Sequence, residues 1–574
     1  MINKNISNLL PGLVGALPEV YQPIFAHPEL SGIVSRDCED RFLHITQAYR
    51  ALEGQLNRPL RVLDLGCAQG FFSFNLAKLG AMVDGVDYLD ANIEVCRALA
   101  TEYPEFKVSF QVGRIEDILP LVEQDQYDLV LGLSVFHHLV YKKGINVVKE
   151  MLAELSGKIT AGIFELALHT EPVYWAPFQP QNSRSILDGF IFVHELAEHK
   201  THLSDVYRPL FVASNQYWFL NGQAGKFDVW QVDSHVFACG VHRGTRRYFF
   251  GKNLCIKIFY LDRIERAEIN FQEYSNEITF LSNPPPGFNS PRLLQQGKSK
   301  NEIWLVREQV PGELLFDIIS AGKKYDAQRV LRDILAQLVA LEAAGIYHND
   351  MRIWNVIIGP DGRASLIDYG AITKDKKDCV WSSSGIFLTF FIFVYEVTTG
   401  QIDFSNPVRT KASSVYQLKQ PYQNWLFAFW QTSSAEWSFK LLQQLFIRID
   451  ELEKDSQIKE GALQQYWIKA IEESVNAQVS FDSYFKEQQL RREMKNKAFQ
   501  KTVLSFQLML CLFKRAISRL FLWPLRKMLT NPYVKIKALN VIDRHPKLKK
   551  HLRMVAMRLG LIVNRSTIKE YKKN

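Results

Sequence analysis

Several features that define other protein classes are missing from this chain. Its seven cysteines are odd in number and scattered, and they form no C-x-x-C pair. This excludes a disulfide-built scaffold and a zinc ribbon, and it fits a reducing compartment. The N-terminus has no basic segment leading into a long apolar core, so no secretory signal is expected. Two uncharged, mostly apolar runs, 385–395 and 502–513, have eleven and twelve residues. Because a bilayer span needs ~20, we expect the first to be a buried helix.

What is present is the composition of an ordinary globular protein. The 574 residues are 47% hydrophobic and 22% charged, which predicts ample core and about three to four domains. The net charge of +9 is unevenly distributed. Residues 491–574 hold 22 Lys and Arg against three acidic residues, whereas the other 490 hold 47 basic and 57 acidic ones. A basic tail on a mildly acidic body points to an anionic partner, either a membrane surface or a nucleic acid.

The most informative stretch is H-N-D-M-R-I-W-N at residues 348–355, with D-Y-G at 368–370. It matches the kinase pattern H-x-D-x-x-x-x-N followed by a conservative variant of D-F-G. Phosphoryl transfer on that fold needs a carboxylate near the attacking hydroxyl and further ligands for magnesium. The sequence therefore predicts Asp350 as the catalytic base, and Asn355 and Asp368 as the Mg²⁺ ligands.

An amino-terminal kinase lobe is expected upstream of these motifs. Lys257, in the apolar run C-I-K-I-F, is predicted to contact the α- and β-phosphates of ATP. Its glutamate partner should lie on the next helix. Glu277 is preferred, and Glu273, one turn earlier on the same helical face, stays open. A strand then enters the hinge, where backbone groups of Glu308 and Val310 are expected to meet adenine.

The glycine loop that normally covers the phosphates is degenerate. Gly240 and Gly244 remain, and Arg246 and Arg247 follow shortly after. These arginines either neutralise phosphate where further glycines would present backbone amides, or form an exposed basic turn. No A-P-E follows D-Y-G, and only residues 371–384 precede the next apolar helix. Because protein kinases carry a longer segment there, a small-molecule or glycan acceptor is favoured over a protein.

A second site is expected near the N-terminus. Residues 61–70 read as a buried strand that runs into the glycine turn D-x-G-x-x-x-G, and an apolar helix follows. This pattern is shorter than G-x-G-x-x-G and suits S-adenosylmethionine better than a dinucleotide. Gly66 allows close approach of the backbone to a ligand. Asp87, at the end of the next strand, is placed to accept hydrogen bonds from both ribose hydroxyls. NAD binding is the main competing interpretation.

Three later runs, 112–117, 127–130 and 131–138, favour a methyltransferase. They resemble the adenine-side loop and the fourth strand of class I methyltransferases. At the end of that strand, His137 or His138 is placed to act as the base that methylation of an alcohol needs. Capping or packing of the strand end explains either histidine equally well. A phosphate acceptor is already anionic and needs no base.

Across roughly residues 15–450 the chain resembles the bifunctional methyltransferase–kinases that terminate O-antigen polysaccharide chains. The domain order agrees, and Y-Q-P-I-F at 21–25, R-D-C at 36–38 and R-Y-F-F-G at 247–251 look specific to that family. The resemblance implies an α/β class I (Rossmann-like) methyltransferase domain fused to an α+β protein-kinase-like bilobal domain, with a basic helical C-terminal tail. The expected segments are the methyltransferase domain over 1–205, the kinase-like domain over 206–455, a helical connector over 456–490 and a basic amphipathic tail over 491–574.

The resemblance also implies a methyl-donor site and a substrate. The residues expected to contact S-adenosylmethionine are Tyr21, Gln22, Arg41, Gly66, Asp87, Arg114, Ile115, Glu116 and Leu133. The family uses ATP and Mg²⁺ to phosphorylate the non-reducing terminal sugar of a mannan-like polymer and then methylates that phosphate. This implies a lipid-linked glycan acceptor and a glycosyltransferase (polymerase) partner. An alternative is a small-molecule or lipid kinase fused to an independent methyltransferase that methylates a sugar hydroxyl directly.

The tail is expected to bind an anionic membrane surface. Its basic residues alternate with Leu, Phe and Trp as in an interfacial helix; they are Lys514, Arg515, Arg519, Arg526 and Lys527. Each contributes about 1 kcal/mol near an anionic leaflet. A nucleic-acid-binding tail would hardly carry twelve consecutive uncharged residues, so no nucleic-acid partner is expected. The implied location is peripheral, on the cytoplasmic face of the inner membrane. A helical dock for the polymerase is the alternative.

Overall fold

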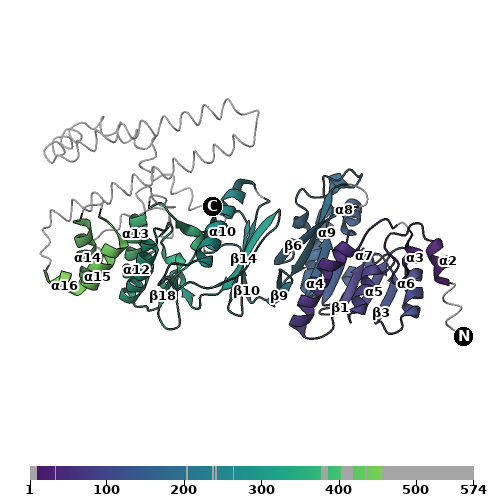
Figure 1. Ribbon diagram of the computed structural model, residues 1–574, viewed down its shortest axis with the longest axis horizontal. Helices are drawn as coiled ribbons and strands as arrows, with labels where there is room; N and C mark the ends of the chain where they lie inside the picture. Colours follow the sequence, from purple (N-terminus) through teal and green to yellow (C-terminus); the bar gives the residue numbers. More distant parts are fainter. Residues whose placement is uncertain are drawn as a thin grey trace, which may run out of the picture. The chain divides into compact units, whose positions relative to one another are not determined.

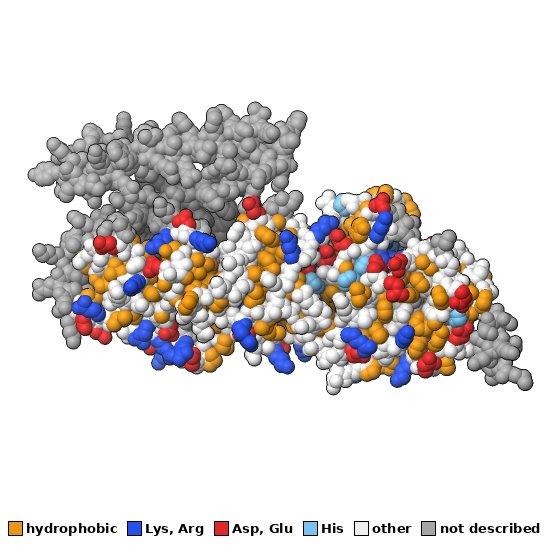
Figure 2. Space-filling model, viewed as in Figure 1, with side chains coloured by type: hydrophobic (Ala, Val, Ile, Leu, Met, Phe, Trp, Pro, Cys, Tyr) orange, Lys and Arg blue, Asp and Glu red, His pale blue; other side chains and the backbone are white. Residues whose placement is uncertain are grey.

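The computed structural model describes residues 9–32, 34–201, 205–235, 238, 242–262, 264–376, 386–402, 418–432 and 436–455. These residues form an N-terminal α/β domain followed by a bilobal α+β domain (Figure 1). The connector predicted at 456–490 and the tail predicted at 491–574 lie outside the described residues. On the face drawn in Figure 2, acidic and basic side chains are interspersed over both domains.

The first domain is built on a seven-stranded sheet of short apolar strands. Its strands are β1 (Arg61–Leu65), β2 (Met82–Asp87), β3 (Val108–Val112), β4 (Leu129–Leu133), β5 (Ala161–Glu165), β6 (Phe192–Lys200) and β7 (Tyr207–Ser214). They are ordered β3-β2-β1-β4-β5-β7-β6. The first five pair in parallel, as βαβ crossovers require, and β7 is antiparallel to both neighbours. The order reverses between β1 and β4, and ligands bind at such switch points beyond the carboxyl ends of the strands.

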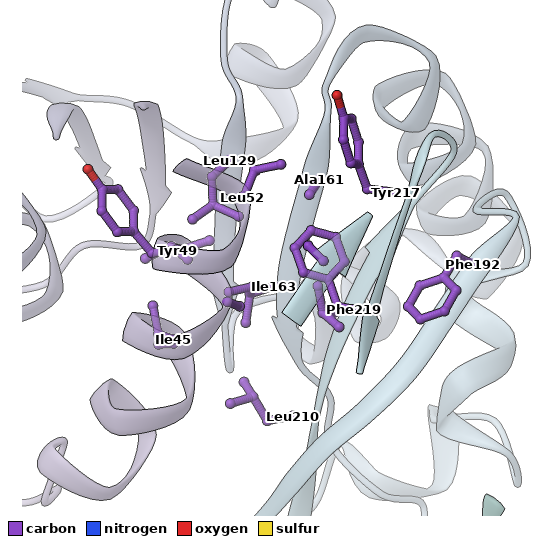
Figure 3. Close-up of a cluster of buried hydrophobic side chains, with 14 of the residues drawn as sticks. Ile45, Tyr49, Leu52, Leu129, Ala161, Ile163, Phe192, Leu210, Tyr217 and Phe219 are labelled. Atoms are coloured by element: carbon purple, nitrogen blue, oxygen red, sulfur yellow. The ribbon is translucent and has the colours of Figure 1, made fainter. Parts of the chain in front are cut away.

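Helices cover both faces of this sheet (Figure 1). They are α2 (Leu9–Gly15), α3 (Pro28–Ser31), α4 (Glu39–Leu56), α5 (Phe71–Lys78), α6 (Asp90–Glu102), α7 (Ile115–Ile118), α8 (Phe136–Lys143) and α9 (Ile145–Lys158). The apolar residues of α4 at Ile45, Tyr49 and Leu52 recur at helical spacing and are fully buried. Figure 3 shows them beside Ile163 and Leu210 of the sheet. Burial of this stripe is what fixes the helix to the sheet.

The structure differs from the predicted domain boundary at residue 205. That position falls between β6 and β7, which pair along their length. The first sheet therefore runs to Ser214. Antiparallel strands of similar apolar character can join either of two adjacent sheets, so the composition of this stretch did not locate the boundary.

A hairpin and several polar contacts join the two domains. The hairpin pairs β8 (Tyr217–Leu220) with β9 (Gln223–Lys226), and its aromatic residues belong to a core that contains side chains of both domains. Around that core, the His194 ring is hydrogen-bonded to the Glu302 carboxylate, and Asn301 Nδ2 donates to Glu195 Oε2 over 2.8 Å. The first domain and the amino-terminal lobe of the second thus share one hydrophobic core.

The amino-terminal lobe is a five-stranded antiparallel sheet with one helix. Its elements are β10 (Val229–Gln231), β11 (Arg246–Gly251), β12 (Leu254–Tyr260), α10 (Ile264–Ser282), β13 (Leu293–Lys298) and β14 (Glu302–Glu308). The sheet order is β10-β11-β12-β14-β13. The predicted glycine loop falls between β10 and β11 in the sequence, and Gly240 lies outside the described residues.

The carboxy-terminal lobe is mainly helical. It contains β15 (Glu313–Leu314), α11 (Leu315–Ser320), α12 (Ala327–Ala343), β16 (Tyr347–His348), β17 (Val356–Ile358), β18 (Ala364–Leu366), β19 (Ile372–Thr373), α13 (Ile386–Thr399), α14 (Gln420–Trp430), α15 (Phe439–Ile447) and α16 (Ile449–Asp455). Helix α12 begins at Asp326, whose side chain accepts from the Arg329 N–H over 3.0 Å as an N-cap. The apolar run predicted as a buried helix forms most of α13. Within the described ranges, no helix is long and apolar enough to cross a membrane. The strand orders of the two domains fit the predicted combination of a Rossmann-like domain with a bilobal kinase-like domain.

Two candidate active sites

The glycine turn of the first site connects β1 to α5. Gly66 and Gly70 both have positive φ, 74° and 79°. A Cβ atom on Gly66 would lie 2.4 Å from Cγ1 of Val135, so no larger residue fits there without movement. The turn therefore holds bare backbone at the carboxyl end of β1, which is the ligand edge of the sheet.

Asp87 is held by backbone N–H groups of the glycine turn and of the loop that follows β2. Its Oδ2 accepts from the Ala68 N–H over 3.0 Å, and its Oδ1 accepts from the Leu89 N–H over 2.8 Å and from Asn92 Nδ2 over 3.3 Å. Because a carboxylate offers about four lone-pair sites, acceptor capacity remains for ribose hydroxyls. The carboxylate that the sequence assigns to ribose is thus buried and oriented.

A segment from the N-terminus closes over the same turn. The Gln22 N–H donates to Gln69 Oε1 over 3.0 Å, and Gln22 Oε1 accepts from the Phe71 N–H over 3.1 Å. Gln69 Nε2 in turn donates to Asn92 Oδ1 over 2.8 Å. Gln22 is therefore bonded to the glycine turn, although the two are far apart in the sequence.

Tyr21 is held through a buried cluster of charges at the end of β5. Arg36 Nη1 donates to the Tyr21 hydroxyl over 2.9 Å, and Arg36 Nη2 is paired with Glu165. Arg41 Nε lies 3.1 Å from the same carboxylate. Burial raises the pKa of Glu165, but the charges on Arg36 and Arg41 outweigh it, so the pKa is lowered. Glu165 is therefore ionised and anchors both arginines.

Arg41 uses its donors within the protein. Besides Glu165, it bonds to the carbonyl groups of Asp37 and Lys200 and to the Asp40 carboxylate. Its side chain is 2% exposed. The predicted contact between Arg41 and the methyl donor therefore requires one of these bonds to be exchanged.

The adenine-side residues follow β3 and β4 at the same edge. Arg114 is exposed and precedes α7, and Ile115 is half-buried. Glu116 Oε1 lies 3.8 Å from Lys143 Nζ. Leu133 ends β4, opposite Glu165 of β5. The structure thus brings these four residues to the carboxyl-end edge of one parallel sheet, after β3 and at the end of β4, where their roles stay predictions.

A second charged cluster lies beside the end of β4. Ser134 has φ of 58°, and its Oγ accepts from Arg208 Nη1 over 3.0 Å. Arg208 also makes two bonds to Glu171, of 2.8 and 2.7 Å. The His137 ring packs at a tilt against His138 and Trp175, with centroid distances of 4.0 and 4.2 Å. Burial, followed by the charges on Lys142 and Arg208, lowers the pKa of His138, which favours the neutral ring at neutral pH.

The second site centres on Asp350. Its Oδ2 accepts from Asn355 Nδ2 over 2.8 Å and from Trp354 Nε1 over 3.3 Å. His348 donates from Nε2 to the Ile367 carbonyl over 3.0 Å, and its Nδ1 accepts from the Asp350 N–H over 3.3 Å. These bonds fix the carboxylate and link the catalytic loop to the strand that precedes Asp368.

The predicted metal ligands supply the donor type that magnesium prefers. Asn355 directs Nδ2 to Asp350, which leaves its carbonyl oxygen for a cation. Asp368 has φ of 64°, and its Oδ1 lies 3.4 Å from Lys257 Nζ. Among the described residues, no group of three or more His, Cys, Asp or Glu is arranged around a metal. Mg²⁺ commonly takes one or two protein oxygens plus substrate phosphates, so the pair fits.

Lys257 is paired with Glu277. Its Nζ lies 2.7 Å from Glu277 Oε2, while Arg307 Nε lies 3.4 Å from Oε1 of the same residue. Burial lowers the pKa of Lys257, but Glu277 and Asp368 raise it more, so the ammonium stays charged. Glu273, the open alternative, lies instead 2.7 Å from Arg246. An intact Lys–Glu pair is one requirement for phosphoryl transfer on this fold.

The backbone of Glu308 at the predicted hinge already has protein partners. Its N–H donates to the Arg292 carbonyl over 3.0 Å, and its carbonyl accepts from Arg307 Nη1 over 2.9 Å. A carbonyl has a second lone pair, so an adenine amino group can still bind there. The contact predicted for Val310 stays a prediction.

Residues 56–159 match the methyltransferase-domain family. The chain is 42% identical over 466 residues to an Escherichia coli protein named O-antigen chain terminator bifunctional methyltransferase/kinase WbdD, which covers 80% of this chain and 65% of the relative. The crystal structure of the bifunctional kinase–methyltransferase WbdD matches with 40% identity and a TM-score of 0.70, over 80% of this chain and 99% of that one. The chain belongs to the WbdD family.

A further WbdD structure, with its C-terminal bundle ordered, matches 86% of this chain and 99% of that one, with 39% identity and a TM-score of 0.75. The family predicted from sequence motifs is thus confirmed. The chain spans 65% of the length of the curated relatives it matches.

Sequence reasoning missed part of this WbdD-family architecture. Arg208 and Glu171 meet beside Ser134, yet neither lies in a recognised motif. Arg208 also falls beyond the boundary predicted for the first domain. The available signal was an acidic and a basic residue in otherwise apolar surroundings, which identifies no partner without the fold. Arg36, whose motif was noted, was not expected to bind Glu165.

Proposed function

We propose that this protein phosphorylates the non-reducing terminal sugar of a mannan-like O-antigen polysaccharide and then methylates that phosphate, which ends chain elongation. The observation that carries the proposal is the presence in one chain of an oriented Asp350, an intact Lys257–Glu277 pair and a complete glycine turn at Gly66. Membership of a family whose Escherichia coli relatives are named O-antigen chain terminators supports the substrate class.

In the kinase step, Asp350 accepts the proton of the attacking sugar hydroxyl. Its hydrogen bonds from Asn355 and Trp354 hold the carboxylate in one orientation, so little reorganisation is needed. Lys257 would hold the α- and β-phosphates, and Asn355 and Asp368 would hold Mg²⁺, which would neutralise charge on the transferred group. ATP supplies the phosphoryl group when it is bound.

In the methylation step, the chain's residues bind and orient rather than remove a proton. A phosphate oxygen is already anionic, so the neutral ring that the lowered pKa of His138 favours is compatible with the reaction. Gln22, Gly66 and Asp87 would hold and orient the methyl donor. S-adenosylmethionine supplies the methyl group when it is bound.

A single experiment separates this order from the alternative. An oligomannose acceptor is incubated with the protein and S-adenosylmethionine, with and without ATP and Mg²⁺. The mass of the product is then measured by mass spectrometry. We expect methyl incorporation only with ATP, at the mass of a methylated phosphate. Methylation without ATP favours direct transfer to a sugar hydroxyl, which needs a base. In that case His137→Ala or His138→Ala should abolish it.

The acceptor class has its own test. Phosphorylation of a free monosaccharide or a lipid, but not of the oligomannose, would favour the alternative of a small-molecule or lipid kinase beside an independent methyltransferase. We expect the opposite preference. The absence of A-P-E after Asp368 supports a glycan over a protein acceptor.

We further propose that the basic tail places the enzyme on the cytoplasmic face of the inner membrane, beside a glycosyltransferase that extends a lipid-linked acceptor. Residues 491–574 lie outside the described structure, so their composition carries this proposal. Deleting them should release the protein from anionic liposomes and leave both activities on a soluble acceptor. Equal liposome binding by the truncated and full-length proteins would contradict it. If residues 491–574 instead bind the polymerase and not the liposomes, the alternative role as a helical docking segment is favoured.

A further inference from the structure

The sheet of the amino-terminal lobe carries a second buried cation on the same face as Lys257. Tyr248 of β11 lies directly opposite Lys257 of β12, and Arg246 lies opposite Phe259. Because side chains alternate along a strand, Arg246, Tyr248 and Lys257 point to one face. Arg246 is 4% exposed. Two basic residues thus face the side of the sheet where the phosphates are expected.

Helix α10 gives each cation its own carboxylate. Lys257 pairs with Glu277, and Arg246 Nη1 pairs with Glu273 Oε2 over 2.7 Å. Asn270, a further turn back, accepts from Arg246 Nε over 3.1 Å through Oδ1. Residues three and four apart share a helical face, so one face of α10 holds both cations. The Arg246–Glu273 pair thus lies on the same strand-to-helix face as the Lys257–Glu277 pair.

One donor atom of Arg246 is left over. Its Nη2 is buried and makes no hydrogen bond of ordinary length among the described residues, and the Tyr248 hydroxyl is the polar group beside the guanidinium on this face. Burying an unpaired guanidinium donor is costly, and native structures seldom leave one without a ligand or water. Such an atom marks a place where a bound acceptor is expected.

Arg246 lies on the side of the sheet where the predicted metal ligand is found. Lys257 Nζ lies 3.4 Å from Asp368 Oδ1, and Arg246 points to the same face of the sheet as Lys257. Arg246 therefore faces the region where Asp368 would hold Mg²⁺, which would neutralise charge on the phosphates. Arg246 is also the first residue of β11 after the degenerate glycine loop.

We propose that Arg246 is a γ-phosphate-binding residue of the kinase site and replaces the backbone amides of a glycine-rich loop. Its Nη2 donates to a γ-phosphate oxygen, while Glu273 and Asn270 are positioning residues that hold the guanidinium fork in place. This inference rests on the proposed kinase function and specifies which side chain neutralises the far end of the nucleotide. A planar, permanently charged guanidinium suits phosphate recognition better than an ammonium.

The test measures nucleotide binding rather than activity. Full-length protein is titrated calorimetrically, in Mg²⁺, with a non-hydrolysable ATP analogue, ADP and adenosine. In Arg246→Gln, we expect affinity for the ATP analogue to fall roughly ten- to hundredfold, as for loss of a hydrogen bond to a charged group. ADP binding should weaken less, and adenosine binding should not change.

Arg247→Gln is the matched control. Arg247 is the next residue, but its Nη1 donates to the Gly244 and Arg246 carbonyls, over 3.1 and 2.7 Å. It also alternates to the opposite face of β11. This variant should bind all three ligands as the wild type does. Circular dichroism and melting temperature establish that both variants fold.

The outcomes separate this inference from the proposed function. Equal weakening of all three ligands in Arg246→Gln, or no weakening, would show that Arg246 is structural and overturn the inference alone. If the wild type binds no nucleotide, both the inference and the kinase proposal fall. Should Arg246→Gln not fold, Arg246→Lys keeps the charge beside Glu273 but lacks Nη2. It should still lose affinity for the ATP analogue relative to ADP.

Discussion

The two candidate sites treat buried charge in different ways. In the first, Glu165 is enclosed by Arg36 and Arg41, and the donors of Arg41 are satisfied within the protein. In the second, Asp368 lies near Lys257, and Nη2 of Arg246 is buried and makes no hydrogen bond of ordinary length in the described structure. We call the first cluster closed because its carboxylate is paired with two guanidinium groups of the chain, although Arg36 Nε makes no hydrogen bond among the described residues. We call the second cluster open because Arg246 and Lys257 share the face of the sheet near which Asp368 lies.

From this difference we expect the two clusters to have different roles. A closed cluster holds a segment in place, since Arg36 fixes Tyr21 and Arg41 bonds to the Lys200 carbonyl. An open cluster attracts a ligand that brings the missing charges. Removing a charge from the closed cluster should therefore cost stability, and removing one from the open cluster should cost activity.

The largest expected effect is on phosphate transfer. Asp350→Ala removes the base and should lower phosphorylation of an oligomannose acceptor by roughly 10²–10⁴-fold. The melting temperature and methyl transfer to a chemically phosphorylated acceptor should not change, because the methyl-donor site has its own residues. Radiolabel transfer from each donor measures both.

Asp361→Asn is a control for that substitution. Asp361 lies in an exposed turn, and its Oδ1 accepts from the Arg363 N–H over 3.0 Å, a bond that Asn can also make. We expect wild-type activity. Wild-type phosphate transfer by Asp350→Ala would refute the kinase assignment.

The next effect is on stability. Glu165→Gln leaves the buried Arg36 without its counter-charge and Arg41 with only its pair to the exposed Asp40. It should destabilise the first domain by roughly 3–5 kcal/mol. Urea unfolding followed by near-ultraviolet circular dichroism measures it. Glu308→Gln, which removes a solvent-exposed pair with Arg292, should leave the transition unchanged. Equal effects of the two substitutions would mean that the cluster around Glu165 is not closed.

Local motifs explain why much of both sites was predictable. Asp350, Asn355 and Asp368 lie close together in sequence, so their spacing already fixes their geometry. Gly66 and Asp87 end consecutive parallel strands, which places them at one edge of the sheet. Each of these predictions needed only short-range order and the period of a strand.

Contacts between distant segments could not be read from the sequence. Glu273 and Glu277 share a helical face, so spacing alone did not decide which one Lys257 binds. The structure uses both, because Arg246 on the neighbouring strand takes the first. The strand that carries Arg208 was likewise assigned to the wrong side of a boundary, since its pairing partners are set by topology and not by composition.

A pH-dependent effect of about 3 kcal/mol is expected in the first site. Burial, with a smaller contribution from Asp87, raises the pKa of Asp64 to about 6, although a hydrogen bond from Ser73 opposes this. The folded chain then holds this proton more tightly than the unfolded chain. Stability from the group is present below pH ~4 and is lost as the pH rises through about 6.

Asp64→Asn removes the ionisation of this carboxyl group and tests whether ionisation destabilises the folded chain. Asn can still accept from Ser73 Oγ, which lies 2.6 Å from Asp64 Oδ2 in the wild type. Relative to the wild type, the variant should be more stable at pH 8 by roughly 3 kcal/mol, and the difference should vanish near pH 4. Denaturant melts of both proteins across this range measure it. A constant difference at all pH values would exclude ionisation as the cause.

The smallest expected effect comes from the tyrosine of D-Y-G. The Tyr369 hydroxyl donates to the Leu366 carbonyl over 3.0 Å, and its ring stacks on Phe280 at a centroid distance of 4.8 Å. Tyr369→Phe keeps the stacking and loses one neutral hydrogen bond, which should cost about 1 kcal/mol. Phosphate transfer should persist, because the variant has the usual D-F-G.

Ser73→Ala removes one hydrogen bond from the first site, as Tyr369→Phe does from the second. Ser73 donates to the Asp64 carboxylate. A hydrogen bond to a carboxyl group that ionises is worth roughly 1.5–3 kcal/mol, so this loss should exceed that in Tyr369→Phe above pH 6. Denaturant melts at pH 8 compare the two variants directly. If Tyr369→Phe instead abolishes phosphate transfer, the tyrosine hydroxyl takes part in holding Asp368. The second site would then depend on a neutral group as well as on its cations.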